Sequence, residues 1–300
     1  MDRITESVEY DYLHYKKTLD KLCDKYRMLS RFTIGKSCVG RDITALKIGK
    51  SSDYALFAAA FHGSEHITTN ILLFFIEEIC RALKEGGTVA GVDVEKAIIG
   101  RGIIFIPRVN PDGCEISVKG AAACGNMAET IGKMCKKDFK HWNANFRGVD
   151  INHNFDAGWK ELREKERSEG IYGPSPRRYG GTRPESEPET VALCNLCRSG
   201  RIRHVMALHS QGEVIYWSYG EKRPPRSEKM AQIMATASGY ALDFPTGLAV
   251  GGGFKDWFIT EMNRPGFTVE LGLGENPLPI ADAEKIYLKA REMLMLSSIM

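Results

Sequence analysis

The sequence predicts an α/β protein whose sheet is covered by helices on both faces. Short, almost continuously apolar segments recur along the chain, for example at residues 54–61 and 203–208. A strand that is buried on both faces has this pattern, whereas a strand with one solvated face alternates between apolar and polar residues. Longer segments with apolar residues at helical spacing lie between them. Strands that alternate with helices are typical of α/β folds.

The individual elements follow from the same patterns. Residues 7–29 place aromatic and apolar residues three and four positions apart, which predicts an amphipathic helix. Residues 31–48 alternate on either side of a turn at Gly40, which predicts a pair of strands. Residues 114–148 lack clear periodicity and predict a long loop excursion. Further strands are expected at 54–61, 101–107, 203–208, 213–219 and 267–269, and further helices at 68–83, 187–200, 226–240, 254–263 and 281–298.

Bulk properties favour one domain with neither a nucleic-acid nor a membrane partner. The chain shows no internal repeat and no linker, so residues 1–300 are predicted to form a single domain. A net charge of +3 from 41 basic and 38 acidic residues is too balanced to predict binding to nucleic acid or to an anionic membrane. No apolar run approaches the roughly 18 residues of a membrane span, and the N-terminus lacks the apolar core of a signal peptide. A cytoplasmic location is therefore expected.

The eight cysteines are scattered along the chain and are predicted to be free thiols, as in a reducing compartment. Cys194 and Cys197 form a CxxC pair, but they lie within a predicted helix and have no second pair or His residue nearby. A structural role is therefore favoured over a metal or redox role.

Ionisable residues follow three of the predicted buried strands. His62 and Glu65 follow the first of these strands, His209 follows the second and Glu270 follows the third. Sites in α/β sheets lie beyond the carboxyl ends of the strands. His62, Glu65 and His209 supply the His₂Glu ligand set of a catalytic zinc, which keeps a fourth position for water. Glu270 is the candidate general base for that water, and a structural salt bridge or helix cap is an equally weighted alternative.

The same stretch allows a rival assignment. Residues 62–66 match H-x-x-E-H, the inverted zincin motif, in which both His residues bind metal and Glu65 is the base. That motif requires a helix that begins before His62. Here an apolar strand leads directly into Gly63 and Ser64. The strand-exit assignment is therefore preferred, with His66 as a neighbour of the site.

Six motifs resemble, in content and in order, those of zinc carboxypeptidases of the carboxypeptidase A type. They are His62–Glu65 after a strand, Asn110–Gly113, Arg147–Phe155, Ser186–Thr190, His209–Ser210 and Thr268–Gly272. The resemblance covers roughly residues 8–298. It implies a single domain with a mixed, twisted eight-stranded sheet and helices on both faces. It also implies a hydrolase with one Zn²⁺ held by His62, Glu65 and His209, and with Glu270 as general base.

The substrate-binding positions depart from the family pattern. The family's Asn-Arg pair, which holds the terminal carboxylate of the substrate, corresponds here to Asn152-His153. A permanently charged fork is thus replaced by an imidazole that is mostly neutral at pH 7. The family's oxyanion Arg aligns with Asn143, whereas Arg147 is close in sequence but occupies another motif position. The substrate-capping Tyr aligns with Leu248. Strong capture of an ordinary C-terminal carboxylate is therefore not expected.

These departures, together with residues 211–217 and 253–258, resemble the bacterial γ-D-glutamyl-diamino-acid peptidase branch of the family. The implied reaction is hydrolysis of the γ-D-glutamyl–diaminopimelate bond of cell-wall peptides by a metal-activated water, so that the partner is a peptide or muropeptide. Lys255 and Arg183 join His153 as candidates to meet the carboxylates of such a substrate, and a solvated surface position is an equally weighted alternative for Lys255 and Arg183.

Contacts to the substrate's amine and the reaction itself leave alternatives open. Glu213 or Asp256 is the candidate for the amine, although a structural hydrogen bond is favoured for Asp256. The first alternative function is a zinc carboxypeptidase or amidase that acts on ordinary or modified peptide C-termini. The second is a catalytically silent module that binds muropeptides.

Overall fold

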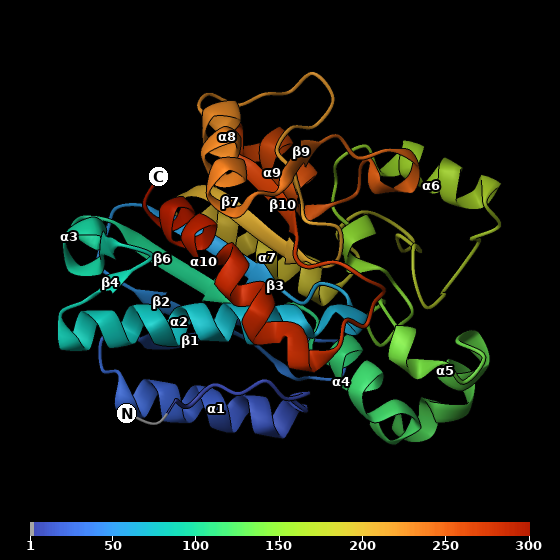
Figure 1. Cartoon of the computed structure of the whole chain (residues 1–300). Coiled ribbons are helices and arrows are strands. Elements are labelled where there is room, and N and C mark those ends of the chain that lie inside the picture. The colour runs from blue at the N-terminus through green and yellow to red at the C-terminus, as the bar shows by residue number, and fades with distance from the viewer. Residues whose placement is uncertain (1–2) are drawn as a thin grey trace.

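The computed structural model describes residues 3–300 and is built around a mixed sheet of eight strands (Figure 1). The spatial order is β1-β2-β6-β3-β7-β10-β8-β9. The strand bounds are β1 (Ser30–Lys36), β2 (Asp42–Ile48), β3 (Tyr54–Ala59), β6 (Gly102–Ile106), β7 (Ile202–His209), β8 (Val214–Tyr216), β9 (Ala241–Asp243) and β10 (Gly266–Glu270). The predicted mixed, eight-stranded α/β architecture is confirmed.

The four central strands, β6, β3, β7 and β10, run parallel to one another. Strands β2 and β8 flank them in the antiparallel direction. The side chains of β6 are fully buried and those of β3 and β7 nearly so, as their continuous apolar sequences predict. Because the central strands are parallel, their carboxyl ends meet along one edge of the sheet.

Helices cover both faces of the sheet and create two separate cores. On β3, the side chains of Ala55, Phe57 and Ala59 enter the first core, and those of Leu56 and Ala58 enter the second, as the two-residue repeat of a strand requires. The first core is shared with α1 (Tyr12–Lys25), α2 (Ile67–Glu85), α8 (Ser227–Ser238) and α10 (Ala283–Ile299). The second is shared with α7 (Pro188–Ser199) and α9 (Phe254–Met262). In Figure 1, α2 and α10 cross in front of the sheet and α7 lies behind it.

The region predicted to be a long loop contains helices instead. Asn110 caps α4 (Pro111–Lys119) by accepting a hydrogen bond from the backbone N–H of Gly113, and α5 (Ala128–Met134) follows. Trp142 and Ile116 anchor a small third core under these helices. Periodicity failed here because the helices are short and interrupted by glycines.

Several further elements are short or strongly polar. The short elements include α3 (Val94–Ile98) and the hairpin of β4 (Thr88–Val89) and β5 (Val92–Asp93). The polar helix α6 (Trp159–Ser168) and the exposed edge strand β9 were not predicted, because neither carries a continuous apolar pattern. Single 3₁₀ turns lie at η1 (Gly63–Glu65), η2 (Gly120–Ala123), η3 (Gly125–Met127), η4 (Phe139–His141), η5 (Ile151–His153), η6 (Gly247–Ala249) and η7 (Ile280–Asp282).

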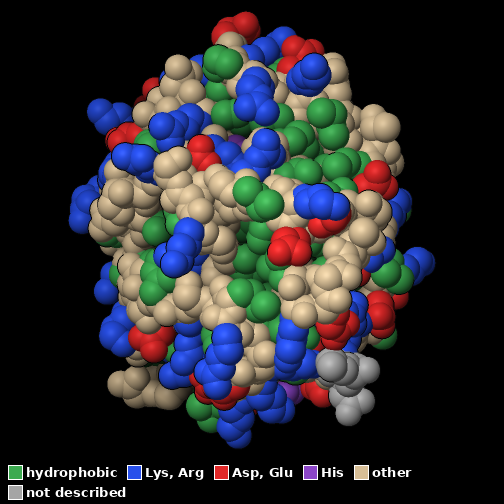
Figure 2. Space-filling view, turned by 90° about the vertical axis from the view of Figure 1, so that its left-hand side faces the viewer, with side chains coloured by type: hydrophobic (Ala, Val, Ile, Leu, Met, Phe, Trp, Pro, Cys, Tyr) green, Lys and Arg blue, Asp and Glu red, His purple; other side chains and the backbone are tan. Residues whose placement is uncertain are grey.

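The surface and the cysteines agree with the composition. Figure 2 shows Lys and Arg side chains together with Asp and Glu on one face, without a patch of one sign covering it. Within residues 3–300, none of the helices combines the length and the apolarity that a membrane span requires. All eight cysteines are free, and Cys194 and Cys197 pack from α7 into the second core.

Candidate active site

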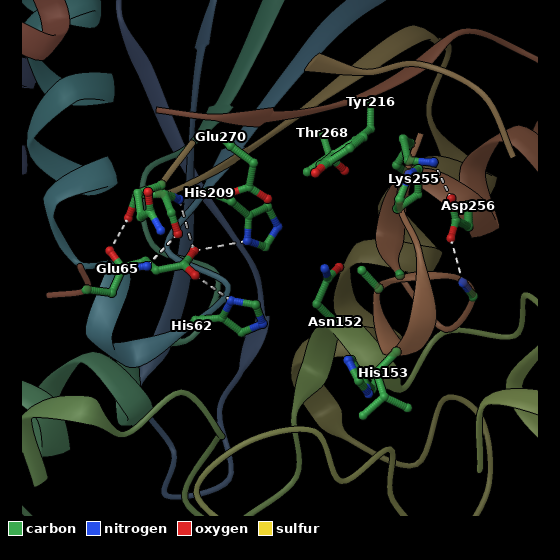
Figure 3. A pocket seen from close by; sticks show the side chains of 18 residues that line it. His62, Glu65, Asn152, His153, His209, Tyr216, Lys255, Asp256, Thr268 and Glu270 are labelled. Atoms are coloured by element: carbon green, nitrogen blue, oxygen red, sulfur yellow. Dashed lines mark hydrogen bonds and ion pairs between the residues drawn. The ribbon is translucent and has the colours of Figure 1, made fainter. Parts of the chain in front are cut away.

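A cavity of about 310 Å³ opens at the carboxyl ends of the parallel strands (Figure 3). His62 and Glu65 lie in the segment between β3 and α2, while His209 ends β7 and Glu270 ends β10. His209 and Glu270 are neighbours in the parallel register of these two strands. The fold thus brings together four residues that lie up to about two hundred positions apart in the sequence, as parallel strands that end at one edge of a sheet allow.

The ligand atoms of His62, Glu65 and His209 converge. The Nδ1 atom of His62 lies 2.9 Å from one carboxylate oxygen of Glu65, and the Nδ1 atom of His209 lies 3.0 Å from the other. One ligand atom from each residue lies within 4.8 Å of the other two. Zinc is held at about 2.0–2.2 Å by two imidazole nitrogens and a carboxylate in catalytic sites, so the three side chains fit this ion. Burial alone would raise the pKa of Glu65, but the two imidazoles lower it to about 2.

A close backbone approach fixes the loop that carries two of these ligands. A Cβ atom at Gly63 would lie 2.3 Å from the carbonyl oxygen of Gly113 and 2.4 Å from that of Trp142. Any larger residue would push the loop away from the α4 region. The Gly in the His-Gly-Ser-Glu sequence therefore seats His62 and Glu65 against the scaffold.

Asp150 orients the first ligand and was not predicted as a site residue. Its Oδ1 atom lies 3.0 Å from the Nε2 atom of His62, and its Oδ2 atom accepts a hydrogen bond from the backbone N–H of Arg178 at 2.9 Å. A carboxylate on one imidazole nitrogen holds the other nitrogen with its lone pair toward a metal. Asp150 belongs to the Arg147–Phe155 motif, and this position was the only sequence signal available for it.

Glu270 has the environment of a general base. Its carboxylate lines the cavity, and no hydrogen bond to it is found among the described residues. Burial, reinforced by the charge of Glu65, raises the pKa of Glu270 to about 8. Once it is deprotonated, a carboxylate with a raised pKa is a stronger base than an ordinary Glu.

The geometry disfavours the inverted zincin assignment. His62 has an extended backbone (φ −103°, ψ 139°), and η1 and α2 begin only after it. His62 and His66 therefore do not share a helix face. His66 is buried outside the cavity lining, and its Nδ1 atom has no partner among the described residues.

Three predicted substrate-binding residues line the cavity on the side opposite the His62–Glu65–His209 set (Figure 3). Asn152 accepts a hydrogen bond from the backbone N–H of Phe254 through Oδ1, which leaves its amide N–H₂ group available. His153 is bound through Nδ1 to a buried carboxylate. Lys255 is 4% exposed and donates from Nζ to the carbonyl oxygen of Ser218 at 2.6 Å and to the carboxylate of Asp256.

Other predicted substrate contacts lie outside the cavity lining. The exposed guanidinium of Arg147 lies 3.5 Å from Glu187, and Arg147 is not among the residues that line the cavity. Asn143 is also displaced from the lining, since its Oδ1 atom accepts the hydroxyl proton of Ser64 at 2.5 Å. Arg183 binds neighbouring carbonyl groups, and Glu213 pairs with a lysine of α10.

The cavity has lining residues that the sequence analysis did not single out. Thr268 and Tyr216 face each other across β10 and β8, between Glu270 and Lys255 (Figure 3). Asn276 bridges to the residue after His209, because its amide donates to the carbonyl group of Ser210 and its Oδ1 atom accepts the Ser210 hydroxyl proton. Thr268 and Tyr216 lie on β10 and β8, in segments that the sequence analysis cited only for their family resemblance, and Asn276 lies in a loop outside every cited motif.

A second group of metal-ligand residue types lies elsewhere, and hydrogen bonds already fill it. Cys38, Glu187 and Glu189 have ligand atoms within 4.8 Å of one another. The Nδ2 atom of Asn145 lies 3.2 Å from the Cys38 thiol and 2.8 and 3.2 Å from oxygens of Glu187 and Glu189. The Oδ1 atom of Asn145 accepts hydrogen bonds from two backbone N–H groups of the following turn, which fixes the orientation of the amide. A cation would meet the amide protons here.

Comparisons with known proteins agree with this geometry. The family model described as zinc carboxypeptidase matches residues 15–295. The chain is 36% identical over 284 residues to gamma-D-glutamyl-L-diamino acid endopeptidase 1 of Lysinibacillus sphaericus. This alignment covers 94% of this chain and 70% of that protein. The chain is 33% identical over 284 residues to the protein YqgT of Bacillus subtilis, covering 93% of this chain and 74% of that protein.

A solved structure shares the fold. Bovine thrombin-activatable fibrinolysis inhibitor, in complex with tick carboxypeptidase inhibitor, superposes with a TM-score of 0.73 at 21% identity, covering 98% of this chain and 96% of that chain. The family match spans most of the chain and includes all three converging ligands and Glu270. The chain belongs to the zinc carboxypeptidase family and is a zinc metallopeptidase.

Proposed function

We propose that this peptidase hydrolyses the bond between γ-D-glutamate and a diamino acid such as diaminopimelate in cell-wall peptides. The observation that carries the proposal is the set of hydrogen-bond donors opposite Glu270, which comprises Lys255, Asn152 and His153. A diaminopimelyl peptide presents several carboxylates, and these donors are suited to bind them. The 36% identity to a Lysinibacillus enzyme named for this bond supports the same substrate class.

His62, Glu65 and His209 would hold one Zn²⁺. When bound, this ion would supply Lewis acidity that polarises the scissile carbonyl group and lowers the pKa of water. Asp150 keeps the His62 imidazole in the orientation that this requires. Glu270 accepts the proton of the attacking water and returns it to the leaving amine nitrogen, a transfer that its raised pKa favours.

The substrate side of the cavity differs from a simple carboxylate clamp. No arginine is among the described residues that line the cavity. Lys255 uses two of its N–H groups on Ser218 and Asp256, so one remains for a substrate carboxylate.

The free cysteines support a reducing, cytoplasmic location, where imported or recycled muropeptides would be the substrate.

Mass spectrometry of reaction products tests the proposal. L-Ala-γ-D-Glu-diaminopimelate peptide and ordinary L-peptides with free C-termini are incubated with the enzyme, with and without chelator. The expected result is release of the diamino-acid fragment from the first peptide only, and loss of this release with chelator. Cleavage of only the L-peptides would replace the proposal with an ordinary carboxypeptidase activity. Tight binding of the first peptide without cleavage would indicate the catalytically silent module.

A further inference from the structure

One substrate-side residue is held by a buried charged pair on α6, a helix outside the cavity lining. The Nδ1 atom of His153 lies 2.8 Å from Oε1 of Glu166. Oε2 of Glu166 accepts hydrogen bonds from the guanidinium of Arg163 and, at 3.1 Å, from the backbone N–H of Gly180. The exposed fractions are 0% for Glu166, 4% for Arg163 and 9% for His153.

The position of these groups gives the imidazole a defined direction. His153 lines the cavity, and its Nδ1 nitrogen is occupied by Glu166. No hydrogen bond of Nε2 is found among the described residues, so it is the nitrogen that is available to a molecule bound in the cavity. Figure 3 shows His153 below Asn152, on the substrate side of the cavity.

We propose that Glu166 is a positioning residue for substrate recognition, acting through His153. With Glu166 on Nδ1 and a substrate carboxylate on Nε2, both N–H groups of an imidazolium have acceptors. The substrate supplies the second negative charge, and Arg163 balances the first. The Arg163–Glu166–His153 chain thereby takes the place of a single arginine as the carboxylate-binding element. This inference rests on the proposed carboxylate-bearing substrate and adds a residue outside the cavity that sets its recognition.

Other charged groups near His153 are compatible with this arrangement. Asp150, at the start of the same turn, adds a further negative charge on the protein side, and it is paired with His62. On α9, Lys255 is neutralised by its adjacent partner Asp256. Among these described carboxylates, Glu166 is the one that forms a hydrogen bond with the imidazole.

The substitution Glu166→Gln reverses the hydrogen bond to His153 with little change in shape. Arg163 and the N–H group of Gly180 both need an acceptor, so the amide oxygen takes the Oε2 position and the amide N–H₂ group faces Nδ1. Nδ1 must then accept this hydrogen bond, so the ring can no longer donate from both nitrogens at once. Binding of a carboxylate at Nε2 is weakened while the ring stays in place.

The test compares paired substrates that differ only in a carboxylate. One carboxylate of the diamino-acid peptide is either left free or converted to a carboxamide. An ordinary L-peptide is supplied in the same two forms. For whichever backbone the enzyme cleaves, Glu166→Gln should raise KM for the free-carboxylate form by about tenfold, the scale of one charge-assisted hydrogen bond. The kcat value and the KM of the carboxamide should change less than about twofold.

The controls separate this role from a structural one. Glu164→Gln changes an exposed glutamate of the same helix and should leave both substrates unaffected. In a His153→Arg background, the guanidinium carries a permanent charge, so Glu166→Gln should no longer discriminate between the two forms. Equal losses on both forms, or no change on either, would overturn the inference. Cleavage restricted to ordinary L-peptides would overturn the proposed function alone, since the paired comparison remains measurable on that backbone.

Discussion

Within residues 3–300, two groups of side chains have the composition of a metal site, and they differ in what lies between their ligand atoms. In the His62–Glu65–His209 group, two imidazole nitrogens face one carboxylate, and a further carboxylate behind His62 fixes the ring. In the Cys38–Glu187–Glu189 group, an amide N–H₂ group lies within hydrogen-bond distance of every ligand atom.

The difference shows that proximity of ligand-type residues does not make a metal site. Both groups are compact, and both are mostly buried. Only the first is oriented by neighbours so that its lone pairs point to a common place. In the second, burial raises the pKa of Cys38 and, with Asp112 nearby, raises the pKa of Glu189 to about 7, so protons and an amide take the place of a cation.

Loss of a ligand in the first group should have the largest effect. His209→Ala removes one of three ligands, so bound zinc and peptidase activity should both be lost. Metal content measured by plasma mass spectrometry, together with the activity of the purified variant, checks this. Near-stoichiometric zinc in the variant would show that the ion binds elsewhere, and it would contradict the assignment of the first group as the metal site.

Loss of the general base should reduce activity without loss of the metal. Glu270→Gln leaves the three ligands intact, so zinc content should match the parent protein, while kcat falls by about 10²–10⁴ because proton transfer fails. Metal analysis and steady-state kinetics on the same preparation measure both quantities. Turnover close to that of the parent would contradict the role of Glu270.

The second group should tolerate loss of its thiol. Cys38→Ser keeps a hydrogen-bond acceptor for Asn145, so zinc content and kcat should stay within about twofold of the parent values. The comparison is made on protein loaded with excess zinc and then desalted. A decrease of one zinc per chain in this variant would reveal a second site.

The smallest effect concerns the pH dependence of stability. Because the pKa of Glu189 is raised from 4.5 to about 7, the folded state binds this proton more tightly than the unfolded state. Its stabilising contribution is present below pH 4.5 and is lost as pH rises through 7. In Glu189→Gln the loss of Tm between pH 5 and pH 8 should be smaller by a few degrees, as measured by calorimetry. The exposed substitution Glu164→Gln should show the parental slope, and an equal slope in both variants would refute this assignment.

The parts of the fold and site that the sequence could predict are those with a local pattern. Buried central strands were predicted because short, continuous apolar runs are typical of strands covered on both faces, and these strand ends then located His62, Glu65, His209 and Glu270. Strand β9 escaped prediction because all three of its residues are exposed. Its place in the sheet depends on pairing with β8, which no local pattern records.

The remaining site residues depend on tertiary contacts. Glu166 lies in a helix in which acidic and basic residues alternate, and nothing in the sequence separates it from Glu161 or Glu164 until the fold buries it against His153. Arg147 was a candidate for the substrate side because it begins the Arg147–Phe155 motif, close in sequence to the position that aligns with the family's oxyanion Arg. The turn that follows Asn145 instead directs it toward Glu187.

Asp150 links two parts of the enzyme that are usually considered separately. One of its oxygens holds the His62 ring, and the same side chain caps the turn that carries Asn152 and His153. A displacement of this carboxylate would therefore move a metal ligand and the substrate-recognition turn together. A substitution at Asp150 would alter metal affinity as well as substrate specificity. Substitutions that change specificity alone are therefore expected at other positions, such as Glu166 or Lys255.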